Sequence, residues 1–172
     1  MMLVRMEIPV GTIAYDGNYF SLRIDDHSKE FVYAGNEVLT VPLTAEGEVI
    51  FNIEPSPAFG VSVLVLSGGE TTADESHSET AGRELREEVG YAPGRLHFLG
   101  EIRPYSKYLT VRSFVYLARD LVPGKLKGDE DYEIPTRRVP LASFENLIAD
   151  GYLQDARVIA ALYMARSFLQ QE

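Results

Sequence analysis

Carboxylates and glycines recur at fixed intervals between Gly69 and Tyr91, where the chain reads GETTADESHSETAGRELREEVGY. Glu87 and Glu88 follow Glu84 by three and four residues, so the three side chains are neighbours on one face of a helix. Oxygen donors at that density suit hard divalent cations such as Mg²⁺ or Mn²⁺. A cation bound there would stabilise the helix and could also bind an anionic phosphate. The spacing therefore predicts a metal site that acts on phosphate groups.

Two further residues fit such a site. Gly68 precedes the stretch, and a backbone without a side chain can approach a ligand closely, so the Gly68 carbonyl is another candidate ligand. Arg83 is four residues from both Glu79 and Glu87 and could hold a carboxylate in place. The alternative is a solvated, salt-bridged surface helix. Between residues 70 and 88, however, seven acidic side chains meet only two arginines, which leaves such a helix few basic partners.

Composition narrows the class of protein. The chain has 172 residues, 45% of them hydrophobic, which suits one domain over 1–172. Its net charge of -10 would repel a nucleic-acid backbone, and the absence of cysteine excludes disulfides, thiolate catalysis and thiolate metal sites. The N-terminus lacks the pattern of a signal peptide, and no run approaches the roughly 18 apolar residues of a membrane span. We expect a soluble, cytoplasmic protein with neither a nucleic-acid nor a membrane partner.

Hydrophobic periodicity predicts a series of strands, most of them in the first half of the chain. Strands are expected at 12–15, 19–24, 31–33, 37–43, 48–53, 61–66, 96–101, 113–117 and 137–139, with 113–117 central. The two prolines in 54–57 argue against a central strand there, and Ser67-Gly68-Gly69 should end the strand at 61–66. Asp16-Gly17-Asn18 predicts a hairpin turn.

Helices are expected in three places. The first runs from about Asp74 to Val89, with a capping box at Ser76, Asp74 as a competing cap, and Gly90 after its last residue. The other two are expected at 143–148 and 155–169. The aromatic residues of the N-terminal strands alternate as strand residues do, which favours core or dimer packing over nucleobase stacking; they are Tyr15, Tyr19, Phe20, Phe31 and Tyr33.

The stretch from Gly69 to Tyr91 resembles the Nudix box, Gly-x5-Glu-x7-Arg-Glu-U-x-Glu-Glu-x-Gly-U, in which U is a bulky apolar residue. The matching positions are Gly69, Glu75, Arg83, Glu84, Leu85, Glu87, Glu88 and Gly90. Tyr91 stands where an aliphatic residue is usual. The resemblance implies an α/β fold, the Nudix α/β/α sandwich with a mixed central β-sheet. It also implies a Nudix pyrophosphohydrolase that cleaves a nucleoside diphosphate derivative.

The resemblance assigns a role to each matching residue. Glu84, Glu87, Glu88 and the Gly68 carbonyl would bind Mg²⁺ or Mn²⁺. Arg83 and Glu75 would orient the loop and the helix. Water would attack a phosphorus of the pyrophosphate, with the metal neutralising charge and lowering the pKa of the bound water.

From residue 48 to 169 the chain resembles the branch of ADP-ribose pyrophosphatases and ADP-compounds hydrolases. The positions that fit are Gly151, Leu153, Asp155, Ala161 and Leu162. This implies ADP-ribose, a nucleotide sugar or a related ADP compound as substrate, and a nucleoside monophosphate as product. It further implies a homodimer formed through the N-terminal strands, about 1–44, and a general base in the acidic loop, either Glu130 or Glu133.

Two departures from the branch bear on the substrate. Ile53 and Val63 stand where the branch carries an arginine and a glutamate that grip substrate. Candidate substrate contacts in this chain are Glu54, Arg103, Tyr105, Lys107 and Arg112. Two other functions remain open: a catalytically weak nucleotide-binding Nudix module with a regulatory role, and a metal-stabilised structural helix without a ligand.

Overall fold

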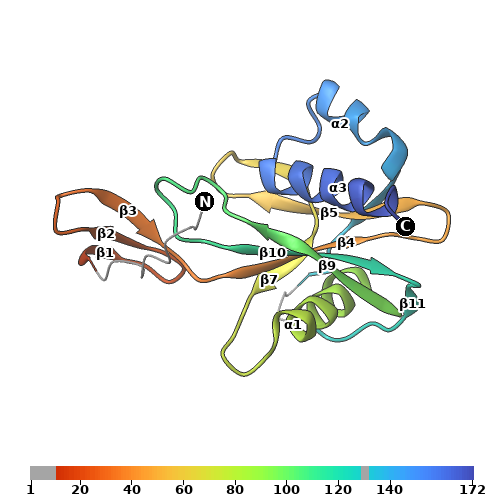
Figure 1. Ribbon diagram of the computed structural model, residues 1–172, viewed down its shortest axis with the longest axis horizontal. Coiled ribbons are helices and arrows are strands. Elements are labelled where there is room, and N and C mark those ends of the chain that lie inside the picture. Colours follow the sequence, from red (N-terminus) through yellow and green to blue (C-terminus); the bar gives the residue numbers. More distant parts are fainter. Residues whose placement is uncertain (1–10, 129–131) are drawn as a thin grey trace.

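A mixed sheet organises the computed structural model, which describes residues 11–128 and 132–172 (Figure 1). Its strands are β4 (Glu37–Pro42), β7 (Ser67–Glu70), β9 (Arg95–Ile102) and β10 (Ser113–Arg119), in the order β7-β4-β10-β9. Strand β10 pairs parallel with β4 and antiparallel with β9, and its first six residues are buried. The central position expected for 113–117 is therefore confirmed. The strand expected at 61–66 ends at Val65, so the expected break is confirmed, but the glycines form a strand of their own, β7, which was not foreseen.

A second, antiparallel sheet packs beside the first. It contains β5 (Glu48–Ser56), β6 (Val61–Val65) and β12 (Thr136–Pro140), in the order β12-β5-β6. Strand β5 runs past its expected end at 53 and continues through Pro55, but it has a partner on only one side there, as expected. The register with β12 ends at Asn52, whereas the register with β6 reaches Ser56. Pro55 thus lies where β5 has lost β12 as a partner, and proline is tolerated at such a strand edge.

Helices cover both faces of the mixed sheet (Figure 1). On one face lie α2 (Glu145–Ala149) and α3 (Ala156–Leu169), which share the main core with residues such as Phe51 and Val115. On the other face α1 (His77–Glu84) packs through Ala81 against Val38 and Phe114. Because neighbouring side chains of a strand point to opposite faces, β10 serves both cores. This is the expected α/β/α sandwich.

The helix at the box begins later than expected. Its N-cap is Ser76, whose hydroxyl accepts from the Glu79 N–H at 3.3 Å while the Glu79 carboxylate accepts from the Ser76 N–H at 2.9 Å. The expected capping box is thus confirmed, and the start at Asp74 was wrong. Three short elements were not foreseen; they are β8 (Tyr91–Ala92), β11 (Val122–Pro123) and the 3-10 turn η2 (Leu141–Ser143).

The first three strands form a separate sheet that extends from one end of the molecule (Figure 1). It consists of β1 (Thr12–Asp16), β2 (Ser21–Ile24) and β3 (Glu30–Tyr33) in that order, and the expected hairpin between β1 and β2 is present. Tyr15, Tyr19 and Phe20 are 67%, 78% and 60% exposed. Core packing of these three rings within one protomer was therefore a wrong expectation. None of the helices in the described ranges has the length and apolar character of a membrane span.

Asp155 caps α3 and also pairs with its first turn. Its carboxylate accepts from the Arg157 and Val158 N–H groups at 2.8 and 3.3 Å and pairs with the Arg157 guanidinium at 2.8 Å. Asp155→Ala is expected to lower the free energy of unfolding by about 1–2 kcal/mol at pH 7, because a lost N-cap has this cost. Urea unfolding measures it. Asp74→Ala, at the exposed competing cap, should cost less than about 0.5 kcal/mol.

The contribution of Asp155 to the free energy of unfolding should depend on pH. Burial raises the pKa of Asp155, but the hydrogen bonds and charge of Arg157 outweigh it and hold the pKa below its usual value. A carboxylate of this kind contributes stability above its unfolded pKa and loses it as the pH falls through the folded value. The difference between wild type and Asp155→Ala should be complete at pH 7 and shrink below about pH 4. A difference that stays constant down to pH 2 would contradict this assignment.

Candidate functional site

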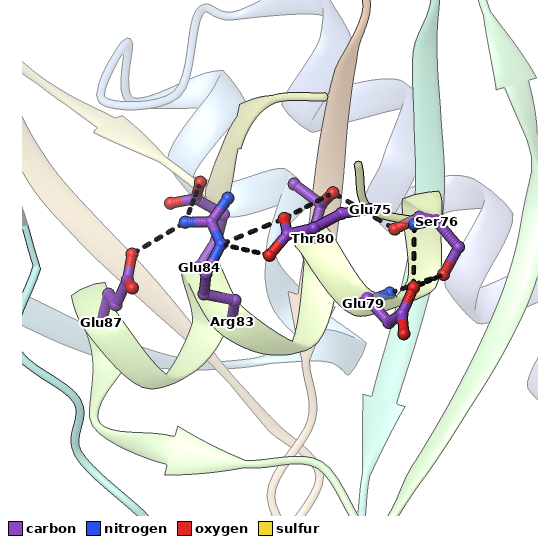
Figure 2. Close-up of polar contacts among 7 residues, drawn as sticks. All are labelled: Glu75, Ser76, Glu79, Thr80, Arg83, Glu84 and Glu87. Carbon is purple, nitrogen blue, oxygen red and sulfur yellow. Dashed lines mark hydrogen bonds and ion pairs between the residues drawn. The ribbon is translucent and has the colours of Figure 1, made fainter. Parts of the chain in front are cut away.

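The Arg83 guanidinium pairs with three of the four carboxylates of the box (Figure 2). Arg83 donates through Nε to both oxygens of Glu75 at 3.1 Å, and its Nη1 lies 2.9 Å from Glu84 Oε1 and 2.9 Å from Glu87 Oε2. Burial lowers the pKa of Arg83, but Glu84, Glu75 and Glu87 outweigh it and raise the pKa. Of the two carboxylates four residues away that Arg83 could hold, it pairs with Glu87, whereas Glu79 closes the capping box.

A wider helical turn follows α1 directly. Leu85–Val89 form a π-helical turn, η1, which ends where the Gly90 N–H donates to the Leu85 carbonyl at 3.1 Å. Gly90 has φ 85°, a left-handed conformation that glycine adopts without steric cost. In this turn Leu85 and Glu88 are buried. Such turns are often found at functional sites.

Glu88 is a buried carboxylate with acidic neighbours. It is 7% exposed, and its Oε2 accepts from Asn52 Nδ2 at 2.8 Å and from the Gly68 N–H at 3.2 Å. Burial raises its pKa to about 8, and the charges of Glu54 and Glu84 act in the same direction. A nearby positive charge would stabilise the ionised form of this carboxylate, which burial and the neighbouring negative charges both disfavour.

The two glycines of β7 let carboxylates of the box approach the backbone of this strand. Gly68 pairs with Leu39 of β4, and its N–H is directed to Glu88. Because the N–H and C=O of one strand residue point to the same side, the Gly68 carbonyl faces the same edge. A Cβ on Gly69 would lie 2.3 Å from Glu84 Oε1. Glycine at position 69 is therefore required for the Glu84 carboxylate to approach β7.

The donors of this site fit a hard divalent cation. Within the described ranges, no three Asp, Glu, His or Cys side chains already converge at metal-binding distances. Arg83 holds Glu84 and Glu87 instead. The oxygen donors of the site are nevertheless of the kind that hard divalent cations take, because the buried Glu88 carboxylate stands near Glu54 and Glu84 and beside Gly68.

A cavity of about 310 Å³ lies beside β7. Its lining joins Gly68 and Glu54 with Arg157 of α3 and with the exposed rings of Tyr19 and Phe20. Glu54 is thus the one expected substrate contact that lines this cavity. Arg157 was not foreseen, because its pairing with Glu37 through two bonds of 2.9 Å joins residues 120 positions apart.

The other four expected substrate contacts follow β9 in the chain. Arg103 and Arg112 both pair with Glu101, and Lys107 lies over the ring of Tyr108. The described lining of the cavity includes none of the four, namely Arg103, Tyr105, Lys107 and Arg112. Their segment docks on β3 through the Val32 N–H, which donates to the Tyr108 carbonyl at 2.8 Å.

The two departures from the branch surround Glu54. Ile53 packs against the main core, so its side chain belongs to the opposite face of β5. Val63 is the cross-strand partner of Glu54 in β6. The positions of the missing arginine and glutamate are therefore apolar neighbours of an acidic side chain.

Of the two candidate general bases, Glu130 lies outside the described residues. Glu133 is exposed and stands shortly before β12. Its segment runs along β5, where the Ile53 N–H donates to the Pro135 carbonyl at 2.8 Å and Thr136 pairs with Asn52. The segment that carries Glu133 thus enters the sheet beside the strand that carries Glu54.

The fold, the box helix and the glycine strand together define a Nudix domain. The family model for the NUDIX domain matches residues 35–162, and the chain belongs to this family. A curated relative, "ADP compounds hydrolase NudE" of Escherichia coli (strain K12), is 36% identical over 107 residues, covering 62% of this chain and 58% of the relative. A solved structure, "Crystal structure of ADP compounds hydrolase", has a TM-score of 0.79 and 28% identity, and the match covers 93% of this chain and 91% of that one.

Substitution of Glu88 tests whether this carboxylate takes part in binding a cation. In metal-free buffer above pH 8 Glu88→Gln is expected to raise the thermal midpoint, because a carboxyl with a pKa of about 8 is then charged beside Glu54 and the amide is not. Saturating Mg²⁺ should raise the midpoint of the wild type more than that of the variant. Thermal unfolding with and without Mg²⁺ measures both effects, and Glu30→Gln, at the exposed first residue of β3, is the control. Equal shifts in wild type and Glu88→Gln would contradict the assignment.

Proposed function

We propose that this protein hydrolyses the pyrophosphate bond of an ADP compound, such as ADP-ribose or a nucleotide sugar, and releases a nucleoside monophosphate. The observation that carries the proposal is the buried Glu88 carboxylate beside Gly68 and Glu54 at the edge of a cavity. The relation to an ADP compounds hydrolase supports the choice of substrate class. The match spans little more than half of that relative, so the activity of the whole chain is our inference.

The residues that would hold the cation are Glu84, Glu87, Glu88 and the Gly68 carbonyl. Mg²⁺ or Mn²⁺ bound there would neutralise charge on the pyrophosphate and lower the pKa of a bound water. Arg83 would keep Glu84 and Glu87 in place through its two contacts of 2.9 Å. Glu75 would fix the guanidinium from the loop side.

The remaining chemistry needs a base and a surface for the substrate. Glu133, or else Glu130, would accept the proton of the attacking water, because each belongs to the acidic loop before β12. Glu54 would contact the substrate in the cavity that it lines. The candidate contacts between β9 and β10 would instead touch the part of the substrate that lies away from the pyrophosphate.

We also propose a homodimer formed through the N-terminal sheet. Ile13, Tyr15, Tyr19 and Phe20 are more than half exposed on this sheet, which extends away from the sandwich (Figure 1). Exposed apolar groups of this kind mark interaction surfaces. Light scattering should give twice the protomer mass, and a single-protomer mass at micromolar concentration would contradict the dimer.

The substrate class can be tested with a panel. ADP-ribose, nucleotide sugars, NADH and dinucleoside polyphosphates are each incubated with the protein, with Mg²⁺, with Mn²⁺ and with a chelator. We expect a nucleoside monophosphate from at least one ADP compound, and only when metal is present, because the charged pyrophosphate needs a cation. Chromatographic identification of the products measures this. Complete inactivity with retained nucleotide binding would favour a regulatory binding module instead.

Glu133→Gln tests the general base. It is expected to lower kcat by about 10²–10⁴-fold, the typical contribution of a positioned base, while KM and Mn²⁺ affinity stay unchanged. Steady-state kinetics on the best panel substrate measures the split. Glu46→Gln, in an exposed turn, is the control and should leave kcat unchanged. A fully active Glu133→Gln would move the role of base to another residue, with Glu130 the next to substitute.

A further inference from the structure

We propose that Asn52 is a positioning residue of the metal site, whose buried amide holds the carboxylates of Glu88 and Glu54 side by side for one divalent cation. This inference rests on the proposed function and adds Asn52 and Glu54 of β5 to the residues of the metal site. Neither residue belongs to the glycine strand or the box helix.

The contacts of Asn52 carry the proposal. Its side chain is fully buried, and its Nδ2 donates to Glu88 Oε2 at 2.8 Å and to Glu54 Oε1 at 3.2 Å. An amide nitrogen has two hydrogens, so each carboxylate can receive one. A neutral group therefore bridges two acidic side chains that would otherwise repel each other.

The strand geometry explains why Asn52 can make both contacts. Residues two apart in a strand point to the same face, so Asn52 and Glu54 point together while Ile53 faces the main core. Glu88 comes from η1, 36 positions later in the chain. Asn52 thus joins the strand and the box helix at the point where their carboxylates meet.

Burial of this amide has a cost that packing does not explain. Among the described residues its Oδ1 is buried without a hydrogen-bond partner. An apolar side chain of similar size would avoid that cost, since a buried polar atom without a partner destabilises the fold. The neighbouring positions Phe51 and Ile50 are apolar and fully buried, as expected in the interior of a strand. The polar residue at position 52 is therefore explained by its two carboxylate partners.

The hydrogen bond from Asn52 also sets the orientation of the Glu88 carboxylate. Asn52 Nδ2 and the Gly68 N–H both donate to Glu88 Oε2, so two separate strands hold this oxygen in place. Partners that orient metal ligands in this way strongly affect metal affinity.

Mn²⁺ affinity of the whole protein, measured by calorimetry without substrate, tests the role of Asn52. Asn52→Leu keeps a similar volume and is expected to weaken Mn²⁺ binding by about 10–100-fold, the usual effect of losing such a partner. Thr40→Val is the matched control, because Thr40 is also fully buried and its Oγ1 also lacks a partner among the described residues. Its Mn²⁺ affinity should match that of the wild type. Unchanged affinity in a folded Asn52→Leu would overturn the proposal.

A kinetic readout separates positioning from general stability. With the panel substrate, Asn52→Leu should regain most of its kcat at high Mn²⁺, while KM for the substrate stays near the wild-type value. A kcat that stays low at saturating Mn²⁺ would overturn the proposal. A wild type that binds Mn²⁺ but hydrolyses no ADP compound would contradict the proposed function alone, because the affinity measurement needs no turnover.

Asn52→Asp keeps the proposal testable if the leucine variant does not fold. It has nearly the same shape and places a third acidic group between Glu88 and Glu54. We expect a lower thermal midpoint in metal-free buffer, and a larger rise on addition of Mn²⁺ than in the wild type, because the cation then offsets more repulsion. Equal Mn²⁺-induced shifts in the two proteins would overturn the proposal.

Discussion

The buried carboxylate of Glu88 is the constraint to which the surrounding structure is fitted. A charge in the interior is unfavourable, and here the charges of Glu54 and Glu84 add to the effect and raise the pKa to about 8. The Asn52 amide and the Gly68 N–H each donate to it and favour its ionised form. A strand, a glycine edge and a helical turn must therefore meet at one point.

Arg83 and the π-helical turn arrange the rest of the box around this carboxylate. Arg83 gathers Glu75, Glu84 and Glu87 on the outer side (Figure 2), while η1 turns Glu88 inward. Three carboxylates of the box are thereby paired with one guanidinium. Glu88 instead accepts from the Gly68 N–H of the glycine strand, which Glu84 also approaches at Gly69.

Departures from the Nudix pattern also have structural causes. Tyr91 stands where an aliphatic residue is usual, and its hydroxyl accepts from Arg138 of β12 at 3.0 Å. Ile53 packs into the main core, and Val63 pairs with Glu54 across β5 and β6. The chain thus keeps the residues of the Nudix box, while the strands beside it differ from the related branch at positions 53 and 63.

The sequence by itself determined the features that depend on local spacing. The box, the capping box at Ser76, the hairpin before β2 and the central strand β10 all follow from periods of a few residues. The break expected before the Gly68-Gly69 pair is present, but local signals did not show that β5 continues along β6 through Pro55 or that the glycines form a strand, because pairing with neighbouring strands decides both.

Only the tertiary structure decided which groups meet. Asn52 and Glu88 are 36 positions apart, and Glu37 and Arg157 are 120 apart, so no local period relates them. The π-helical turn depends on packing around Leu85 and on the left-handed Gly90, which helix periodicity does not encode. The sequence therefore identified the carboxylates, and the fold selected the buried one and its partners.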